Sequence, residues 1–424
     1  MTVRRWLGGA LTAGAAFLVA CSDDSGSSAT PVAQATARAT AAPSTPAAAA
    51  TPDRPQRNAD GTLGRLSQTE ERIANQLGTR YPNTDFRKRT VDLSEIVDGG
   101  PGKDGGIPSL QDPSFVTQKD AGEWLKFDEP VVAVQVNGEA RAYPIQILMW
   151  HEMANDTLGG VPIVVTFCPL CNTAITFDRR VDGTARKFGV SGLLRASDLI
   201  MYDRTNESLW QQITGEAIVG RDVGKRLTFL PSQIVSWRDF QQTYPDALVL
   251  SRNTGFTRNY GQNPYQGYDS IGSSTIFPVP GADTRRLDAK ERVLTVEIGR
   301  ETVAFPFSEL AKAVVLTTKV DGKDVVAFWQ TGTTSALDDL LIAGGRDVGS
   351  AGAFFPVVDG RALEFRKNAE GKIVDRQTDS VWNVLGRAVS GDLKGKQLEP
   401  VISANHFWFA WSVFKPETRI VKAN

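Results

Sequence analysis

The two cysteines of Cys168-Pro169-Leu170-Cys171 are the most reactive arrangement in the sequence. The flanking segments 163–167 and 173–177 are rich in β-branched and aromatic residues, which predicts two short strands with the pair at the tip of a β-hairpin. A thioredoxin-type site instead places its first cysteine at a helix N-terminus, where the thiol pKa is lowered. Because no helical periodicity follows Cys171, the sequence argues against that fold.

Two cysteines at this spacing fit three kinds of site. In a redox pair, one thiol attacks and the other resolves, which predicts an accessible disulfide that is easily reduced. In a metal site, the pair would hold zinc or copper together with other ligands, because the chain has no second Cys-x-x-Cys. In a structural staple, the bridge would be worth only about 2 kcal/mol because the loop is so small. The redox interpretation leads, and all three stay open.

His151 is one of only two histidines and lies near the end of the helix expected at 145–153, just before the strand that leads to Cys168. An imidazole near Cys168 could stabilise a thiolate or transfer a proton. Cys168, Cys171 and His151 are therefore the predicted catalytic residues, and the same three are the ligands in the metal alternative. A helix histidine bonded to a backbone carbonyl explains His151 equally well. The other histidine, His406, lies in an aromatic run and is expected to serve packing.

Two further groups of polar or aromatic residues have ordinary explanations beside functional ones. Carboxylates and a basic residue surround the strand that ends at Tyr202, and turn capping is their expected role: Asp198, Asp203, Arg204 and Glu207. The segment 259–268 carries three tyrosines on a Gly- and Pro-containing loop. These tyrosines either line the mouth of a pocket or cover the core.

The elements around these residues occur twice. Segments 131–136 and 293–298 each predict a strand, followed by a Gly turn, a second strand, and a Pro that opens a short helix at 145–153 or 307–315. The correspondence continues along both parts of the chain through Asp203, Ser208, Trp210 and Gly220 against Asp375, Ser380, Trp382 and Gly391. Such self-similarity indicates two copies of one layout. The cysteines occur only in the first copy, which favours a special role over shaping a turn.

The predicted fold is α+β and β-rich: an internally duplicated domain of short antiparallel strands with few short helices. Hairpin turns are expected at Asp182-Gly183 and Asp321-Gly322, and the clearest further helix at 231–243. The first repeat is expected at 63–285, with the cysteine hairpin and the tyrosine-rich insertion, and the second, cysteine-free repeat at 286–424.

The N-terminus predicts export. Arg4 and Arg5 precede an apolar stretch too short to span a membrane comfortably, and Leu18-Val19-Ala20-Cys21 looks like a lipobox. We therefore expect a lipoprotein signal peptide at 1–20, a lipid on Cys21 as the membrane partner, and an extracytoplasmic location. Residues 21–62, rich in Ala, Thr, Pro and Ser, predict a disordered tether. In such an oxidising compartment disulfides persist.

Composition limits the remaining function classes. The chain has 424 residues, 41% hydrophobic and 22% charged, with a formal net charge of -1. This is ordinary globular composition with length for two core-forming units. No basic field favours nucleic acid, so we expect no nucleic-acid partner. A redox or protein partner is expected but not identified.

Several motifs together carry a family resemblance. They are the Gly-rich segment 99–108, Ala142-Tyr143-Pro144, Trp150-His151-Glu152, Asn155-Asp156, Cys168-Pro169-Leu170-Cys171 and Asn263-Pro264-Tyr265. From about residue 92 to the C-terminus the chain resembles the DUF3179 family, a bacterial and archaeal family of unknown function. Some members are described as selenoproteins. The resemblance thus implies redox chemistry at Cys168 or Cys171, because selenium adds nucleophilicity and reversibility that a staple does not need.

Overall fold

A computed structural model describes residues 58–423, which fall within one compact unit, Arg54–Asn424. The predicted signal peptide, the lipidation site Cys21 and nearly all of the predicted tether lie outside the described residues. None of the helices in the described part is both long enough and apolar enough to cross a membrane.

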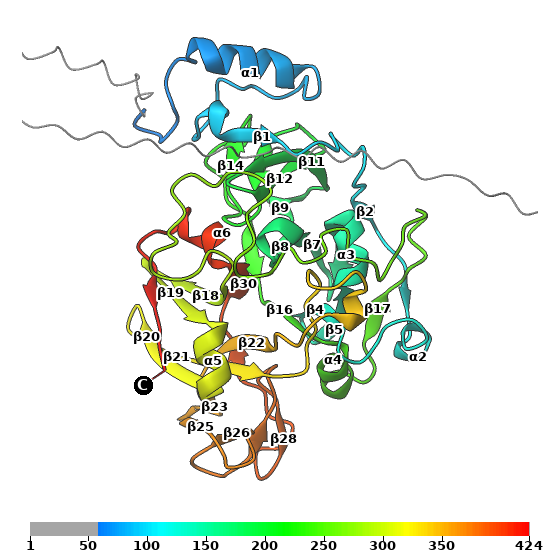
Figure 1. Cartoon of the computed structure of the whole chain (residues 1–424), viewed down its shortest axis with the longest axis vertical. Helices are drawn as coiled ribbons and strands as arrows, with labels where there is room; N and C mark the ends of the chain where they lie inside the picture. Colours follow the sequence, from blue (N-terminus) through cyan, green and yellow to red (C-terminus); the bar gives the residue numbers. More distant parts are fainter. Residues whose placement is uncertain (1–57, 424) are drawn as a thin grey trace, which may run out of the picture. The chain divides into compact units, whose positions relative to one another are not determined.

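The predicted β-rich α+β fold is confirmed: short, mostly antiparallel strands form several sheets, and the helices are few and short (Figure 1). The first helix has a complete capping box, in which the Ser67 hydroxyl and the Glu70 carboxylate each accept from the other's backbone N–H. The α-helices of the described residues are α1 (Gln68–Gly78), α2 (Gln118–Ala121), α3 (Ile145–His151), α4 (Trp237–Thr243), α5 (Phe307–Ala313) and α6 (Trp408–Ser412).

Three five-stranded sheets come from the first part of the chain. One has the order β16-β4-β5-β17-β3, formed by Ser232–Ser236, Pro130–Val136, Glu139–Pro144, Leu248–Leu250 and Phe115–Val116. The second has the order β15-β8-β7-β6-β2, formed by Thr228–Leu230, Thr173–Asp178, Val161–Cys168, Met153–Leu158 and Leu110–Gln111. The third has the order β1-β11-β12-β13-β14, formed by Ile96–Asp98, Phe188–Arg195, Asp198–Asp203, Leu209–Gln211 and Ala217–Val219. A small ribbon pairs β9 (Arg180–Val181) with β10 (Thr184–Ala185).

The second part of the chain forms three four-stranded sheets. Their orders are β30-β18-β19-β31 (Ser403–Phe407, Arg292–Ile298, Glu301–Pro306, Arg419–Ile420), β20-β21-β22-β29 (Val315–Val320, Lys323–Gln330, Ser350–Phe355, Glu399–Pro400) and β25-β26-β27-β28 (Phe365–Lys367, Ile373–Asp375, Val381–Trp382, Ala388–Ser390). A second ribbon pairs β23 (Val357–Val358) with β24 (Arg361–Ala362). The parallel pairing of β5 with β17 has its counterpart in β19 with β31. These are the pairings that a duplication would produce; the duplication and its boundaries stay predictions.

The structure confirms the predicted Asp-Gly turns and the two short helices that follow a proline. Asp182 and Gly183 have φ of 50° and 76°, and Asp321 and Gly322 have 47° and 76°. Positive φ at both central residues suits the tight turn that joins right-twisted antiparallel strands. Accordingly these turns join β9 to β10 and β20 to β21. The helices expected at 145–153 and 307–315 are α3 and α5, each two residues shorter at its end.

The helix predicted over 231–243 is wrong in its first part. Residues Ser232–Ser236 form β16, which pairs along the edge of β4, and only Trp237–Thr243 is helical. Ser236 is the N-cap, because its hydroxyl accepts from the Asp239 N–H. Ile234, Trp237 and Phe240 are spaced as on one face of a helix. In the structure Ile234 belongs to β16, and only Trp237 and Phe240 belong to α4.

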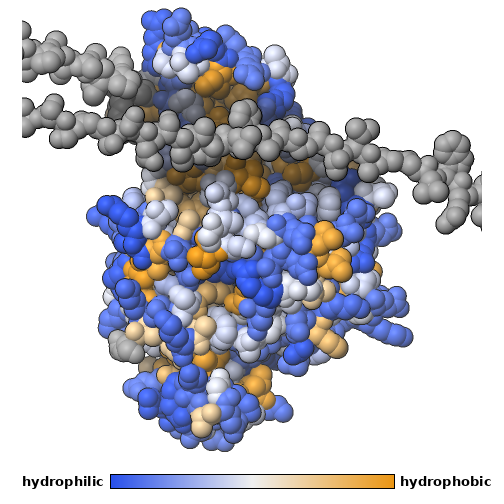
Figure 2. All heavy atoms as spheres, viewed as in Figure 1, coloured by the Kyte–Doolittle hydropathy of each residue, from blue (hydrophilic) through white to orange (hydrophobic). Residues whose placement is uncertain are grey.

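The largest hydrophobic core cluster takes residues from both parts of the chain. It contains Phe167, Cys168 and Cys171 from the cysteine hairpin, together with Phe407 and Trp408 from β30 and α6. In Figure 1, β7 and β8 lie between the β11–β12 strands and the β16–β4 strands, so the hairpin sits inside the fold. On the face shown in Figure 2, hydrophilic residues predominate and hydrophobic ones gather in separate groups.

Candidate functional site

The predicted hairpin is confirmed, and it fixes the positions of both cysteines. Strand β7 ends at Cys168, a single 3₁₀ turn covers Pro169–Cys171, and β8 begins at Thr173, the strand partner of Cys168. Asn172 closes the turn with φ 50°, in the left-handed region that asparagine tolerates better than most residues. Pro169 suits the first position of this turn because it lacks an N–H to satisfy.

The accessibility that was expected of the cysteine pair is wrong, because both side chains are buried. Both cysteines are free thiols, and their exposed fractions are 2% for Cys168 and 0% for Cys171. Both sulfurs face the turn that joins β11 to β12: Ser197 O lies 3.3 Å from the Cys171 Sγ and 3.8 Å from the Cys168 Sγ. The hairpin tip is therefore covered by neighbouring sheets instead of exposed to solvent.

Asp198 stands beside the sulfurs at the start of β12. Its Oδ1 lies 3.5 Å from the Cys171 Sγ, and its Oδ2 accepts from Gln211 Nε2 at 2.6 Å and from the Ile213 N–H at 3.0 Å. Complete burial raises the pKa of the Asp198 carboxyl to about 7, and burial also raises the pKa of the Cys171 thiol. From the sequence, Asp198 was expected among the turn-capping residues. Of those, Asp203 does cap its turn, by accepting from the Thr205 N–H at 2.7 Å.

Glu152 supplies a second buried carboxylate on the same side. It ends α3 in the left-handed conformation, with φ 55°, and is only 8% exposed. No described residue gives its carboxylate a hydrogen bond or an ion pair. Burial, and then the negative charge of Asp198, raise the pKa of Glu152 to about 8. An unpaired buried carboxylate is expensive, which makes Glu152 the least satisfied polar group near the sulfurs.

His151, the residue just before Glu152, is not part of this group. Its Nδ1 is 2.7 Å from the carbonyl oxygen of Pro108, and its Nε2 is 2.6 Å from the Tyr260 hydroxyl. Burial lowers the pKa of His151 to about 4. With both ring nitrogens engaged, His151 matches the backbone-satisfied alternative. Asp198 lies beside the sulfurs, and Glu152 shares a cavity wall with Cys168. The sequence placed Asp198 among turn residues and Glu152 only in a family motif, because no local pattern shows which carboxylates the packing brings to the hairpin.

A cavity of about 200 Å³ adjoins the site. Cys168 and Glu152 line it, with Tyr265 from the tyrosine-rich insertion, and the remaining wall is mostly apolar: Gly99, Pro101, Ile107, Pro169, Leu170, Val190, Gly192, Leu193, Leu194, Leu199, Ile276 and Phe277. Gly192 has φ 76°, and a Cβ there would lie 2.7 Å from the Gly102 N, so glycine is required where the Gly-rich segment crosses β11.

The tyrosine-rich insertion, residues 259–268, lines the cavity with Tyr265 and contacts the cysteine turn with Tyr268. The Tyr268 hydroxyl donates to the Leu170 carbonyl oxygen at 3.1 Å, within the cysteine turn itself. The buried Lys290 ammonium donates to the Tyr268 carbonyl oxygen and lies 3.5 Å from the centre of the Tyr268 ring. Asp269 pairs with the Arg292 guanidinium at 2.6 Å. Of the two roles expected for the tyrosines, Tyr265 lines a pocket and Tyr268 covers the core.

The ligand atoms of Cys168, Cys171 and Asp198 all lie within 4.8 Å of one another, and no cation compensates them among the described residues. Around a tetrahedral zinc ion, bond lengths of about 2.3 Å to sulfur and about 2.0 Å to oxygen put these atoms about 3.5 Å apart. The observed separation of Cys171 Sγ and Asp198 Oδ1 is 3.5 Å. The arrangement can therefore hold three protons or one cation.

Comparison with known proteins finds one relationship. The model of the family described as "Protein of unknown function (DUF3179)" matches residues 104–418, which include the cysteine hairpin, Glu152, Asp198 and the tyrosine-rich insertion. Neither the curated proteins nor the solved structures that were compared with this sequence gave a match. Because the match covers most of the chain, this chain belongs to the DUF3179 family.

Proposed function

We propose that the protein binds a zinc-type divalent cation through Cys168, Cys171 and Asp198. The single observation that carries the proposal is the convergence of three buried donor atoms within 4.8 Å, with no cationic side chain of residues 58–423 acting on them. Burying several acidic groups together is unfavourable unless they stay protonated or gain a cation. Zinc binding would displace those protons and supply the missing charge.

The donor set favours zinc over copper, which the sequence left open. Copper(I) prefers sulfur ligands alone, whereas zinc accepts thiolates and a carboxylate in one tetrahedral shell. Calcium and magnesium require oxygen ligands and would reject the two sulfurs. Three protein ligands leave a fourth position, and Cys168 lines a cavity from which a further ligand could reach it. A site with an open position next to a cavity is of the kind that binds a small molecule at the metal.

Metal analysis of the full-length protein, purified under reducing conditions, tests this proposal. We expect one zinc per chain, lost in Cys168→Ser, Cys171→Ser and Asp198→Asn. Substitution with cobalt(II) should give the intense sulfur-to-metal absorption of thiolate ligation. Asp203→Asn is the matched control, because Asp203 is a buried carboxylate on the same strand that pairs with Arg186 instead of facing the sulfurs. A folded protein that takes up neither zinc nor cobalt would refute the proposal.

A second candidate function, thiol–disulfide exchange, is favoured by the place of Cys168 on the cavity wall. Here the two thiols would reduce a substrate disulfide: they lose two electrons and two protons, a Cys168–Cys171 bond forms, and the substrate leaves as two thiols. Asp198 and Glu152, with pKa values of about 7 and 8, would relay the protons. The two sulfurs must approach to about 2.05 Å to form this bond, so the turn has to move.

Thiol trapping across a redox titration separates the two functions. A pair that oxidises reversibly well above about -300 mV, in protein free of metal, supports exchange. A pair that stays locked below that potential rules exchange out. Protection of both thiols from alkylation by zinc alone, reversed by a chelator, supports the metal site.

We also propose that the protein is exported and anchored through a lipid on Cys21, on the strength of the lipobox-like Leu18-Val19-Ala20-Cys21. Growth of an expressing bacterium with labelled fatty acid should label the wild-type protein and leave Cys21→Ser unlabelled. Equal labelling of both, or of neither, would contradict the anchor.

A further inference from the structure

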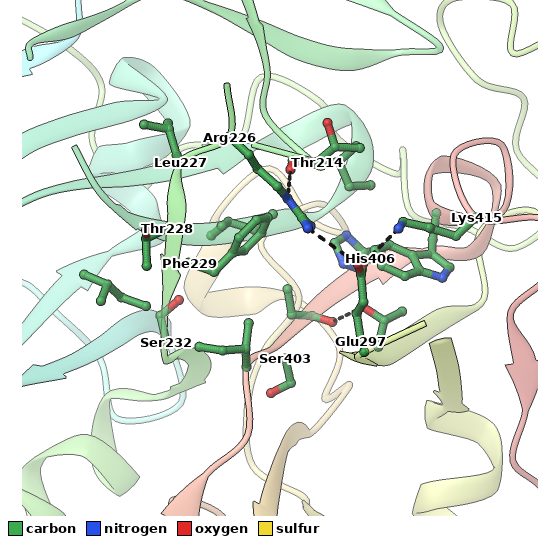
Figure 3. A pocket seen from close by; sticks show the side chains of 18 residues that line it. Thr214, Arg226, Leu227, Thr228, Phe229, Ser232, Glu297, Ser403, His406 and Lys415 are labelled. Carbon is green, nitrogen blue, oxygen red and sulfur yellow. Dashed lines mark hydrogen bonds and ion pairs between the residues drawn. The ribbon is translucent and has the colours of Figure 1, made fainter. Parts of the chain in front are cut away.

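A second, larger cavity of about 400 Å³ lies where the two parts of the chain meet, apart from the cysteine site. Strand β15 and the segment before it form one wall, and β18, β30 and α6 form the other (Figure 3). Its volume is in the range of cavities that take metabolite-sized ligands. Its apolar lining includes large aromatic and aliphatic side chains: Ile175, Ile213, Leu227, Phe229, Leu230, Ile402 and Trp411.

The charged groups of this cavity carry an excess of positive charge. Arg226 and Lys415 reach toward Glu297 from opposite sides (Figure 3), with N–O distances of 3.5 Å and 2.9 Å. One carboxylate thus serves two cations. Arg226 and Lys415 keep 44% and 24% of their side chains exposed, so both retain free N–H donors for a further anion.

His406 gives the cavity an unsatisfied buried polar atom. The residue is 1% exposed, its ring stacks on Trp411 with 4.9 Å between ring centres, and its Nδ1 lies 2.8 Å from the Thr173 hydroxyl. We assign the hydrogen of that hydroxyl to the Cys171 carbonyl oxygen, 3.2 Å away, which makes Nδ1 the donor to Thr173. The Nε2 is then a hydrogen-bond acceptor, and no described residue donates to it.

We infer that this cavity binds a small organic carboxylic acid whose apolar or aromatic body carries a hydrogen-bond donor. The carboxylate pairs with Arg226 and Lys415, the body packs on Phe229 and Trp411, and the donor group satisfies the Nε2 of His406. The ligand carboxylate would compensate the excess positive charge at the rim. The ligand donor would give the Nε2 of His406 the hydrogen-bond partner that it lacks among the described residues. The inference is independent of the metal proposal, since the two cavities share no lining residue.

The test uses three probes that differ by one group each: 4-hydroxybenzoate, benzoate without the donor, and 4-hydroxybenzamide without the charge. Calorimetric titration into the full-length protein should show 4-hydroxybenzoate binding about fivefold tighter than benzoate and about tenfold tighter than the amide. Added salt should weaken the binding of both carboxylate probes and leave the binding of the amide unchanged. This comparison needs no variant of the buried His406, whose replacement could disturb folding.

Variants of the partly exposed rim then give effects of opposite sign. Arg226→Gln and Lys415→Gln should each weaken 4-hydroxybenzoate binding about three- to tenfold, because each removes a cation. Glu297→Gln should tighten binding about threefold, because it removes the competing carboxylate. Arg238→Gln, an exposed arginine paired with Asp128 and absent from the cavity lining, is the control and should change nothing.

Two results would overturn the inference. One is the absence of saturable binding of either carboxylate into the millimolar range. The other is binding that ignores the rim charges, so that Glu297→Gln and Lys415→Gln shift affinity in the same direction.

Discussion

Replacement of Glu152 by glutamine removes the one carboxylate near the cysteines that has no partner. Glutamine keeps the size of the side chain and discards only the charge. In the metal-free protein, the folded state holds the Glu152 proton up to a pKa of about 8, whereas the usual value for this group is 4.5. The folded state therefore binds this proton more tightly than the unfolded chain does.

A group whose pKa is raised by folding stabilises the fold while it stays protonated, below its usual value, and this contribution is lost as the pH rises toward the folded pKa. From about pH 5 to about pH 9, Glu152 alone should lower the free energy of unfolding by on the order of 4 kcal/mol, at about 1.4 kcal/mol per tenfold change in proton affinity. Glu152→Gln should be close to wild type in stability at the low pH and more stable by up to that amount at the high pH.

Denaturant unfolding, followed by tryptophan fluorescence with reductant and chelator present, measures this difference at each pH. Glu70→Gln is the control of opposite sign. Burial alone would raise the pKa of Glu70, but the Arg89 guanidinium, 2.7 Å from its carboxylate, holds the pKa below the usual value. Its replacement leaves a buried arginine unpaired and should destabilise the fold by about 3 kcal/mol or more at neutral pH.

A flat difference between Glu152→Gln and wild type across this pH range would refute the reasoning. So would a loss of stability that grows with pH. Either result would mean that the Glu152 carboxylate has a compensating partner in solution.

Three further predictions follow from the same geometry. The apparent zinc affinity should rise by about two to three powers of ten per pH unit near neutrality, because two thiols and, in part, the Asp198 carboxyl with its pKa of about 7 release protons on binding; an affinity that ignores pH in calorimetric titration contradicts thiolate ligation. His151→Gln should keep its zinc but lose about 1–3 kcal/mol of unfolding free energy, because it loses contacts with the Pro108 carbonyl and the Tyr260 hydroxyl; a folded variant without zinc would restore His151 to the site. Tyr268→Phe should lose about 1 kcal/mol and make Cys168 react faster with an alkylating reagent, since the bond to Leu170 holds the insertion over the turn; an unchanged alkylation rate would show that the insertion does not guard the sulfur.

The sequence determined those features that neighbouring residues decide among themselves. Runs of β-branched and aromatic residues on either side of the cysteine turn predict the hairpin, and Asp-Gly pairs predict turns with positive φ. A Pro directly precedes both α3 and α5. The same reasoning failed at 231–243, because the edge of β4 takes Ser232–Ser236 as a strand. Hydrogen bonding to a neighbouring sheet overrode a weak local periodicity there.

Only the tertiary structure decided what surrounds the sulfurs. Asp198 is 27 residues from Cys171 and meets it because the third sheet packs over the cysteine hairpin. The sequence predicted His151 at the site. In the structure, Glu152, which ends α3 in the left-handed conformation, lines the cavity instead. Thr173 and His406, 233 residues apart, are joined in the same way. The spacing of side chains along a strand determines which face of the sheet each residue occupies. The packing of one sheet on another determines which distant side chain that residue contacts.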